Sequence, residues 1–353
     1  MKTKVIKLNP RDFNPEDLKE PAEALASGQL TAFPTETVYG IGADAAKTGA
    51  VADLLKIKQS PADKPLTIHM ANPNDITPYT AKPPATAIKL MKKFWPGPLT
   101  IIIPDKNERL TGFRVPSCAI TRELIRMSGV HIAATSANVS GGADAVNADD
   151  VLKEFDGKIS FLIDSGETQF KKPSTIVKIA AQSYEIIREG VIPASLIKDT
   201  ANMTILFVCT GNSCRSPMAE GLLKKMLAKR LNITPEELED NGYRIISAGT
   251  SAMYGGRASD NAITIMKEMG ADIRFHIARP VTNQMVRDAD KIFVMSRVHK
   301  LILSEEFPNC AAKMELLDPD NSDVEDPVGS PIETYRQCAR KIKKLLEARL
   351  KEL

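Results

Sequence analysis

The chain has 353 residues, enough for two domains of ordinary size and too many for one ordinary core. Its composition, 43% hydrophobic and 26% charged, is that of a soluble globular protein and argues against disorder. A net charge of +3 is too small for bulk attraction to nucleic acid or to a membrane surface, so only local anion sites remain open.

No segment of the sequence predicts export, membrane insertion or a metal centre. Residues 1–10 are interrupted by charge and lack an apolar stretch of signal-peptide length, so we expect a cytoplasmic protein with no membrane partner. No run approaches the roughly 20 apolar residues of a membrane helix. The five cysteines form no Cys-x-x-Cys pair, and the four histidines are widely spaced. We therefore expect reduced thiols and no metal site.

Short β-branched runs alternate with helical patterns along the whole chain, which is typical of α/β architecture. The first helix is expected to begin at Asn14-Pro15, an N-cap followed by proline, and to end at Gly28. The next expected elements are strand 30–33, helix 49–58, strand 66–70, helix 85–94 and strands 99–103, 131–134, 161–164, 175–179 and 185–187.

The pattern of elements lapses over residues 191–202, where Pro, Ser, Lys, Asp and Asn gather, and a new strand begins at Met203. We place a domain boundary there, with one domain over 1–200 and a second over 203–353. The expected elements of the second domain are strand 204–208, helix 217–231, strand 243–247, helix 260–269, strand 291–295 and helix 332–350. This order predicts a small doubly wound parallel sheet.

One loop of the second domain carries a phosphate-binding pattern. A strand runs directly into Cys209-Thr-Gly-Asn-Ser-Cys-Arg215-Ser216-Pro217, where a helix begins. Backbone N–H groups and the helix dipole converge at such a loop, so it can cradle a phosphoryl group and favour a nucleophilic thiolate at Cys209. Arg215 can curl back onto two phosphoryl oxygens, and Ser216 can donate to the sulfur. This predicts a cysteine-nucleophile phosphatase; the alternative is a structural cysteine in a strand–helix turn.

A phosphatase of this kind also needs an acid that protonates the departing oxygen. Asp318-Pro319 and Asp326-Pro327 are the two candidates, and either pair can simply begin a turn. Asp326 is preferred, because the terminal helix that follows its turn can fix it against the carboxyl edge of the sheet.

The segments 208–220, 247–249 and 326–327 together resemble the low-molecular-weight protein tyrosine phosphatase family, over essentially all of 203–353. The resemblance implies a phosphorylated protein substrate and no cofactor. It assigns Cys209 as nucleophile, Arg215 as phosphate binder and Asp326 as general acid. It makes Asn212, Ser213, Cys214 and Ser216 supporting residues of the loop, with Cys214 able to form a reversible disulfide with Cys209 under oxidation.

Two positions bear on the substrate. Tyrosine-specific members of the family usually carry a bulky apolar residue where Ser213 stands, and aromatic residues where Val328-Gly329 follow Asp326-Pro327. We therefore expect phosphoarginine to be preferred over phosphotyrosine. The thioredoxin-coupled arsenate reductases have a very similar loop but need further cysteines, the first of them at a place held here by Ser296.

The first domain contains a series of hydroxyl-rich and basic segments. These are 33–42, Lys58, 114–116, 134–141 and 173–176. Lysine, arginine and Ser/Thr hydroxyls fit a concave site for a triphosphate and a small polar substrate, although each segment alone also fits a capped turn or a solvated charge.

In this order the segments resemble the YrdC-like threonylcarbamoyl-adenylate synthase family over roughly 4–197, which implies a twisted α/β sheet domain. Members of that family combine L-threonine, bicarbonate and ATP into threonylcarbamoyl-AMP, which serves tRNA modification. The implied partners are these substrates, with Mg²⁺ able to accompany ATP, the tRNA-modification machinery and double-stranded RNA. Thr35 would contact threonine, and Arg114 would lie close to the pocket. The implied nucleotide and phosphate site consists of Lys58, Ser136, Asn138, Ser174 and Arg188.

Two departures from this family's pattern leave two hypotheses open. Where the family usually has Lys-x-Arg, this chain has Lys58-Gln-Ser60, and the missing arginine would contribute about 2 kcal/mol to ligand binding if its contact were buried. Where the family usually has His-Pro, this chain has Cys118-Ala119. Lys56, Lys64 and Arg122 are candidate substitutes for that cation. The chain is then either a bifunctional synthase and phosphatase, or an active phosphatase joined to a non-catalytic module that binds nucleotide or RNA.

Overall fold

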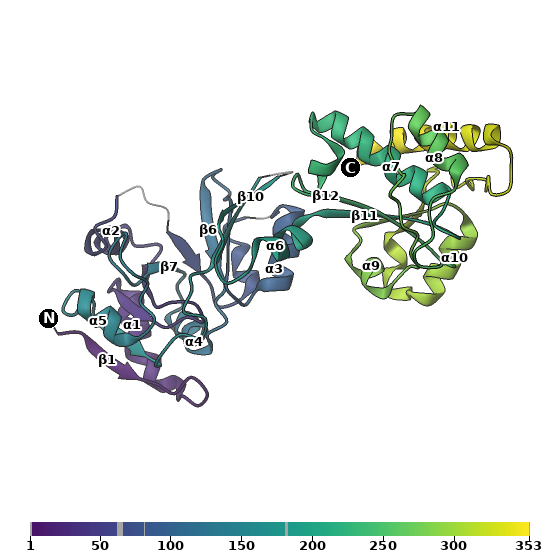
Figure 1. The fold of residues 1–353 in the computed structure, drawn as a ribbon. Helices are drawn as coiled ribbons and strands as arrows, with labels where there is room; N and C mark the ends of the chain where they lie inside the picture. The colour runs from purple at the N-terminus through teal and green to yellow at the C-terminus, as the bar shows by residue number, and fades with distance from the viewer. Residues whose placement is uncertain (1, 62–65, 81, 181–182, 353) are drawn as a thin grey trace. The chain divides into compact units, whose positions relative to one another are not determined.

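The computed structural model describes residues 2–61, 66–80, 82–180 and 183–352. The chain divides into two compact units, Met1–Ala201 and Asn202–Leu353, drawn from purple to teal and from green to yellow in Figure 1. Each unit contains its own sheet and its own buried clusters.

A ten-stranded mixed sheet lies at the centre of the first unit, with the described strands in the order β1-β8-β2-β3-β7-β4-β6-β5-β9-β10. The strands are β1 Lys4–Lys7, β2 Thr31–Phe33, β3 Gly40–Asp44, β4 Thr67–His69, β5 Leu99–Pro104, β6 Leu110–Arg114, β7 Ile132–Ser136, β8 Phe161–Asp164, β9 Thr175–Ile179 and β10 Tyr184–Arg188. Parallel and antiparallel pairs alternate irregularly, for example β2 parallel to β8 but antiparallel to β3.

Helices cover both faces of this sheet. They are α1 Lys19–Ser27, α2 Thr48–Ile57, α3 Ala85–Phe94, α4 Ala119–Ser128, α5 Ala148–Phe155 and α6 Ala194–Ala201, with 3-10 turns at Pro15–Leu18 and Pro73–Ile76. Neighbouring strand residues enter different clusters, because successive side chains point to opposite faces. Phe33 and Ile163 pack with α1 and α4, whereas Ala32 and Leu162 pack with α2 and α5.

The second unit is built on a four-stranded sheet in which every described pair is parallel. The strand order is β12-β11-β13-β14. The strands are β11 Met203–Cys209, β12 Tyr243–Gly249, β13 Lys291–Val294 and β14 Met314–Leu316. The first strand of this unit, β11, therefore lies inside the sheet, and the order of strands reverses next to it. In open α/β sheets, ligands bind at the carboxyl ends of strands at such a point.

Five helices flank this sheet in the described part of the second unit. They are α7 Arg215–Leu231, α8 Asp260–Glu268, α9 Asn283–Asp288, α10 Arg297–Glu306 and α11 Ile332–Arg349, with 3-10 turns at Pro235–Leu238, Pro308–Lys313 and Leu350–Glu352. Ile205 and Phe207 of β11 pack with α7, α8 and α11, whereas Leu206 and Val208 pack with α9 and α10. The expected α/β architecture of both parts, with the doubly wound parallel sheet in the second, is confirmed.

Some elements differ from the expectation. Residues 191–202 are not a connecting segment throughout, since α6 occupies Ala194–Ala201 and buries Ile197 and Ala201 in the cluster that contains α3. Strand β3 carries no run of β-branched residues to signal it. Gly42 is needed there because a Cβ would lie 2.2 Å from the Ile132 side chain and 2.9 Å from the Phe33 ring.

The described helices include none that is both long enough and apolar enough to cross a lipid bilayer.

Candidate active sites

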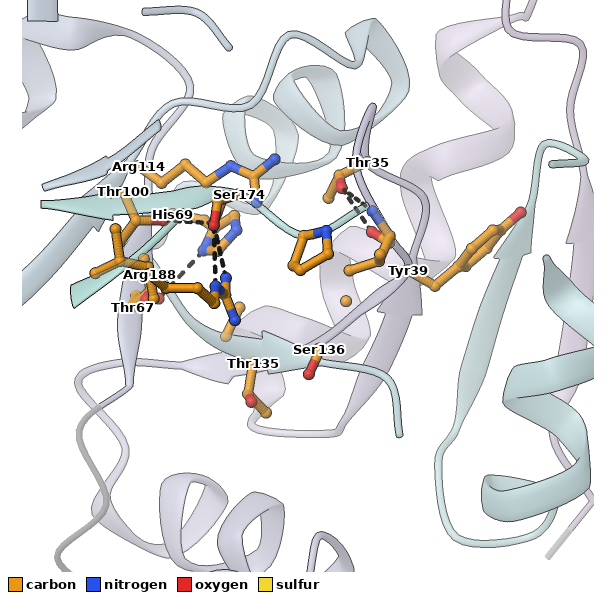
Figure 2. Close-up of a pocket in the computed structure, with 15 residues that line it drawn as sticks. Thr35, Tyr39, Thr67, His69, Thr100, Arg114, Thr135, Ser136, Ser174 and Arg188 are labelled. Carbon is orange, nitrogen blue, oxygen red and sulfur yellow. Dashed lines mark hydrogen bonds between the residues drawn. The ribbon is translucent and has the colours of Figure 1, made fainter. Parts of the chain in front are cut away.

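A pocket of about 220 Å³ opens in the first unit among the ends of its central strands (Figure 2). Five of the predicted residues line it, namely Thr35, Arg114, Ser136, Ser174 and Arg188. The rest of the lining is formed by Val38, Tyr39, Gly40, Thr67, His69, Thr100, Ala134, Thr135, Pro173 and Ile176. The wall is therefore rich in hydroxyls and has cations, which suits a small polar or anionic ligand.

A buried ion pair fixes one wall of this pocket. Arg114 Nη2 donates to Glu36 Oε1 at 2.6 Å and to Thr37 Oγ1 at 2.8 Å, and both charged side chains are almost fully buried. Glu36 Oε2 also accepts from the backbone N–H of Ser117 at 2.9 Å. Burial alone would raise the pKa of Glu36, but Arg114 and these hydrogen bonds hold it below its usual value. Arg114 thus positions the loop of Glu36 as well as facing the ligand space.

His69 lines the pocket, although the wide spacing of the four histidines predicts structural or surface roles for them. Burial and the nearby Arg114 lower the pKa of His69 to about 4, so the imidazole is neutral at pH 7. Its Nδ1 lies 3.2 Å from the Thr67 carbonyl oxygen, which requires Nδ1 to carry the proton. The other ring nitrogen, Nε2, is then an acceptor. The observation that could have indicated a role for His69 in the site is its position at the end of strand β4, next to the polar residues of the pocket.

Ser174 and Arg188 form a second group at the pocket (Figure 2). Arg188 donates to the Ser174 carbonyl oxygen from Nε at 3.1 Å and from Nη2 at 2.8 Å. The Ser174 hydroxyl lies 3.0 Å from Thr100 Oγ1. Burial lowers the pKa of Arg188 from its usual value, yet the guanidinium stays charged. The arrangement presents a positive group at the pocket together with two hydroxyls.

Lys58 and Asn138, also expected to line the nucleotide site, lie outside the wall of this pocket. Lys58 is 2% exposed, and its ammonium donates to the carbonyl oxygens of Ser136 and Asn138. Asn138 accepts from Ser136 Oγ at 2.6 Å and donates to the Gly142 carbonyl oxygen at 2.7 Å. In this structure both side chains therefore hold the loop after β7.

Two of the candidate substitutes for the missing arginine, Lys56 and Arg122, do not line the pocket either. Lys56 lies on a separate surface depression with Gln59, and Arg122 is on α4. Lys64 lies outside the described residues.

The predicted phosphate loop of the second unit lies between β11 and α7, and the helix begins two residues before the expected Pro217. Cys209 is the last residue of β11 and is 2% exposed, and α7 begins at Arg215. The sulfur lies 3.0 Å from Ser216 Oγ. Asn212 Nδ2 donates to the same Ser216 oxygen at 3.0 Å, and the single Ser216 proton can go to the sulfur or to the Ala248 carbonyl oxygen at 3.4 Å. A hydrogen bond from Ser216 and the first turn of α7 are both features that can stabilise a thiolate.

Asn212 holds the loop in shape from its centre. Its backbone is left-handed, with φ of 53°, and its side chain is fully buried. Nδ2 also donates to Ser247 Oγ at 2.9 Å, Oδ1 accepts from the Arg279 backbone N–H at 3.0 Å, and the Asn212 carbonyl oxygen accepts from His276 Nε2 at 2.8 Å. Ser247 in turn donates to Glu220 Oε2 at 2.6 Å.

Of these partners, Glu220 and Ser247 belong to segments that the sequence singled out. The contributions of His276 and Arg279 carry no local signal.

The predicted phosphate binder and general acid meet directly. Arg215, 5% exposed, donates from Nη2 to Asp326 Oδ2 and from Nη1 to the Val324 carbonyl oxygen at 3.2 Å. Asp326 Oδ1 accepts from the Val328 backbone N–H at 3.2 Å, which fixes the carboxylate at its turn. Asp318, the other candidate acid, is buried and caps its own turn by accepting from Asp320 N at 2.9 Å. The geometry favours Asp326 as the acid.

The remaining thiols and hydroxyls of the loop are supporting groups. Cys214 is buried, with its sulfur 3.3 Å from Ser259 Oγ and 3.4 Å from Tyr335 OH. Ser213 is half-buried, with its hydroxyl 3.6 Å from the Cys214 sulfur. Ser296 is the N-cap of α10, and Cys310 lies in the 3-10 turn Pro308–Lys313.

Across the described ranges no group of three or more His, Cys, Asp or Glu side chains is arranged to hold a metal ion.

Comparisons with known proteins divide the chain in two. The family model Sua5/YciO/YrdC, described as telomere recombination, matches residues 23–190, and that of the low molecular weight phosphotyrosine protein phosphatases matches residues 204–353. A putative threonylcarbamoyl-AMP synthase of Methanocaldococcus jannaschii is 38% identical over 204 residues, covering 55% of this chain and 96% of the relative. A protein-arginine-phosphatase of Bacillus subtilis is 33% identical over 155 residues, covering 43% of this chain and 97% of the relative.

A solved structure of Pyrococcus abyssi Sua5 complexed with L-threonine matches with a TM-score of 0.54 at 23% identity, covering 97% of this chain and 98% of that chain. At this identity the match shows a similar fold only. The chain spans only about half the length of other curated synthases, 56% of the one from B. subtilis and 54% of the one from P. abyssi. Through its first part the chain belongs to the Sua5/YciO/YrdC family of threonylcarbamoyl-AMP synthases, and through its second part to the low molecular weight protein phosphatases.

Proposed function

We propose that the chain carries two activities, a threonylcarbamoyl-AMP synthase in residues 1–200 and a phosphoprotein phosphatase in residues 203–353. The observation that carries the phosphatase is the arrangement of Cys209, Arg215 and Asp326 around one loop. The observation that carries the synthase is the pocket of Figure 2, whose hydroxyls and cations suit threonine and a nucleotide phosphate. The relatives named above act on such substrates, and the cytoplasm remains our expected location.

In the phosphatase reaction, the Cys209 thiolate attacks phosphorus while the bond from phosphorus to the leaving group breaks. Asp326 gives its proton to the leaving atom, and Arg215 turns from Asp326 to the phosphoryl oxygens. A water molecule then attacks the cysteinyl phosphate and loses its proton to Asp326. The sulfur leaves as a thiolate, which the Ser216 hydroxyl stabilises, so the enzyme returns to its starting state. No metal is required for these steps, because Arg215 and the loop N–H groups neutralise the phosphoryl charge.

Phosphoarginine is the substrate that the site fits best. Ser213 offers a small hydroxyl that accepts a guanidinium hydrogen bond, and Val328, 64% exposed, stands where an aromatic ring would flank a phosphotyrosine. A stacked ring is worth about 1 kcal/mol, so its loss disfavours tyrosine. Tyr254, the aromatic residue that could form a wall from another loop, is 82% exposed.

The expected result is a higher kcat/KM for a phosphoarginine peptide than for the matching phosphotyrosine peptide. Ser213→Ile should reverse the preference, whereas Ser213→Thr, which keeps the hydroxyl, should preserve it. A wild type that favours phosphotyrosine tenfold would overturn the assignment.

A second candidate function exists for the first unit. Lys58 is engaged by carbonyl oxygens behind the pocket, and Ser60 replaces the usual second cation. A triphosphate would then meet fewer positive charges than in an active synthase, which favours a module that binds nucleotide or RNA without catalysis. Under either function, the proposed partners include double-stranded RNA and the tRNA-modification machinery. ATP would be a substrate of the synthase or a ligand of the binding module, and Mg²⁺ would bind together with ATP.

Ligand binding and turnover separate the two candidates. Because a ligand that binds only the native state stabilises it, ATP with L-threonine at about 100 times the Kd should raise the free energy of unfolding of the first unit by about 2.7 kcal/mol. The measurement is the melting temperature of the full chain, followed by pyrophosphate release after addition of bicarbonate.

If release occurs, Ser60→Arg should increase it, and the matched control Gln59→Arg, whose side chain lies on a separate depression, should not. Stabilisation without release favours the binding module. A melting temperature indifferent to saturating ATP and threonine would sink both candidates.

A further inference from the structure

His299 is a buried histidine beside the phosphate loop that the reaction proposed above does not use. It lies in the first turn of α10 and is 4% exposed. Its Nε2 lies 2.9 Å from the hydroxyl of Thr210, the residue that follows Cys209, and its Nδ1 lies 2.8 Å from Ser296 Oγ. Both ring nitrogens are thus engaged, one by the phosphate loop and one by the N-cap of its own helix.

Arg215, which can only donate, limits the direction of these hydrogen bonds. Arg215 Nη2 reaches Thr210 Oγ1 at 3.5 Å, so this oxygen is an acceptor toward the guanidinium. The single proton of the Thr210 hydroxyl can then be donated to His299 Nε2 in the tautomer that leaves this nitrogen unprotonated. The imidazole proton lies on Nδ1 and is donated to Ser296 Oγ. One neutral tautomer satisfies the whole chain of contacts.

We propose that His299 is a positioning residue that holds the Thr210 hydroxyl as an acceptor for Arg215, and so orients the guanidinium that binds phosphate. This inference rests on the proposed phosphatase function and adds a member to its site. Arg215 Nη2 contacts both Asp326 and Thr210, so the contact with Thr210 retains this nitrogen at the loop when the phosphoryl group replaces Asp326 as the partner of the guanidinium.

The charges around His299 agree with a neutral role. Arg215 of the phosphate loop faces the ring, as do Asp326 and Asp323 of the segment before α11, and Asp323 is itself engaged by Arg297 at 3.4 Å. Burial, followed by the charge of Arg215, lowers the pKa of His299 to about 4, against the weaker opposite effect of the two carboxylates. A protonated ring would donate to Thr210 and repel Arg215, which would break the arrangement.

The test compares four single variants of the full chain. His299→Leu and Thr210→Val each remove one side of the contact, and each should weaken the binding of inorganic phosphate by roughly fivefold, with a smaller effect on kcat than on KM for p-nitrophenyl phosphate. The double variant should lose no more than either single one. His299→Gln, whose amide oxygen can reach the place of Nε2, and Thr210→Ser should bind phosphate as the wild type does.

The pH profile gives a readout that a merely structural role would not move. The wild type and His299→Gln should show the same dependence of kcat/KM between pH 5 and 8, because His299 stays neutral throughout that range. Loss of one limb of the profile in His299→Gln would make His299 a proton carrier and overturn the proposal. Unchanged phosphate binding in a folded His299→Leu, or His299→Gln behaving as His299→Leu does, would also overturn it.

The experiments distinguish failure of the proposed phosphatase function from failure of the proposed role of His299. If the wild type does not hydrolyse p-nitrophenyl phosphate, the phosphatase function fails, and calorimetry with inorganic phosphate still decides whether His299 and Thr210 position Arg215. If His299→Leu does not fold, Thr210→Val decides the same question, because Thr210 is exposed and its replacement leaves the buried ring in place.

Discussion

Replacing Cys209 with serine should lower hydrolysis of p-nitrophenyl phosphate by about 10⁴-fold or more, the largest effect expected of any single change in the chain. The reason is that a hydroxyl at this position is a far weaker nucleophile at neutral pH than a thiolate stabilised by Ser216 and the start of α7. The measurement is steady-state turnover without added metal. Quenching of the wild-type reaction should additionally trap a phosphoryl group on the Cys209 peptide.

Cys214→Ser is the matched control, since it makes the same chemical change in the same loop. The serine hydroxyl would lie between Ser259 and Tyr335, both of which can hydrogen-bond with it, so activity should stay within about tenfold of the wild type. Comparable losses in the two variants would show that the effect is one of loop structure and would remove Cys209 from the role of nucleophile.

Asp326→Asn should produce a loss that depends on the leaving group. For an alkyl phosphate, whose departing oxygen needs a proton, the expected decrease in kcat is about 10²- to 10⁴-fold, the usual size of general acid catalysis. For p-nitrophenyl phosphate, whose phenolate leaves without help, the decrease should be much smaller. Asparagine keeps one oxygen, which can still accept from the Val328 backbone N–H, so the turn should persist although the bond to Arg215 is lost.

Asp318→Asn provides the comparison for this experiment. Its side chain also accepts a backbone N–H within an Asp-Pro turn, and asparagine preserves that bond. The variant should show the leaving-group dependence of the wild type. An Asp326→Asn enzyme that turns over the alkyl phosphate normally, with Asp318→Asn impaired, would transfer the acid role to Asp318.

The parts of the sites that could be predicted from the sequence are those carried by contiguous residues. The strand that ends at Cys209 and the helix that starts at Arg215 fix the phosphate loop locally, so the residues alone indicate a nucleophile and a phosphate binder. The comparisons confirm the two families behind these patterns. The individual site roles remain predictions.

What could not be predicted depends on contacts between distant segments. Arg114 meets Glu36 across 78 positions, and Asn212 meets the backbone of Arg279 across 67. Neither pairing follows from periodicity or composition, because both depend on strand register and on how loops return to the sheet. Lys58 shows the converse case. The motif around Lys58 predicts a ligand contact, but in the structure its ammonium donates to the carbonyl oxygens of Ser136 and Asn138.

The support of Asn212 has a consequence for protein engineering. The left-handed turn at the centre of the loop is held by side chains and backbone from three separate segments, around Ser216, Ser247 and residues 276–279. Nine residues copied from Cys209 to Pro217 into another strand–helix junction would bring the nucleophile and Ser216, but not Ser247 or residues 276–279. A loop transferred to another protein would need the buried residues that support Asn212 as well. The smallest part of the chain that could be transferred with a working site is therefore close to the whole four-stranded domain.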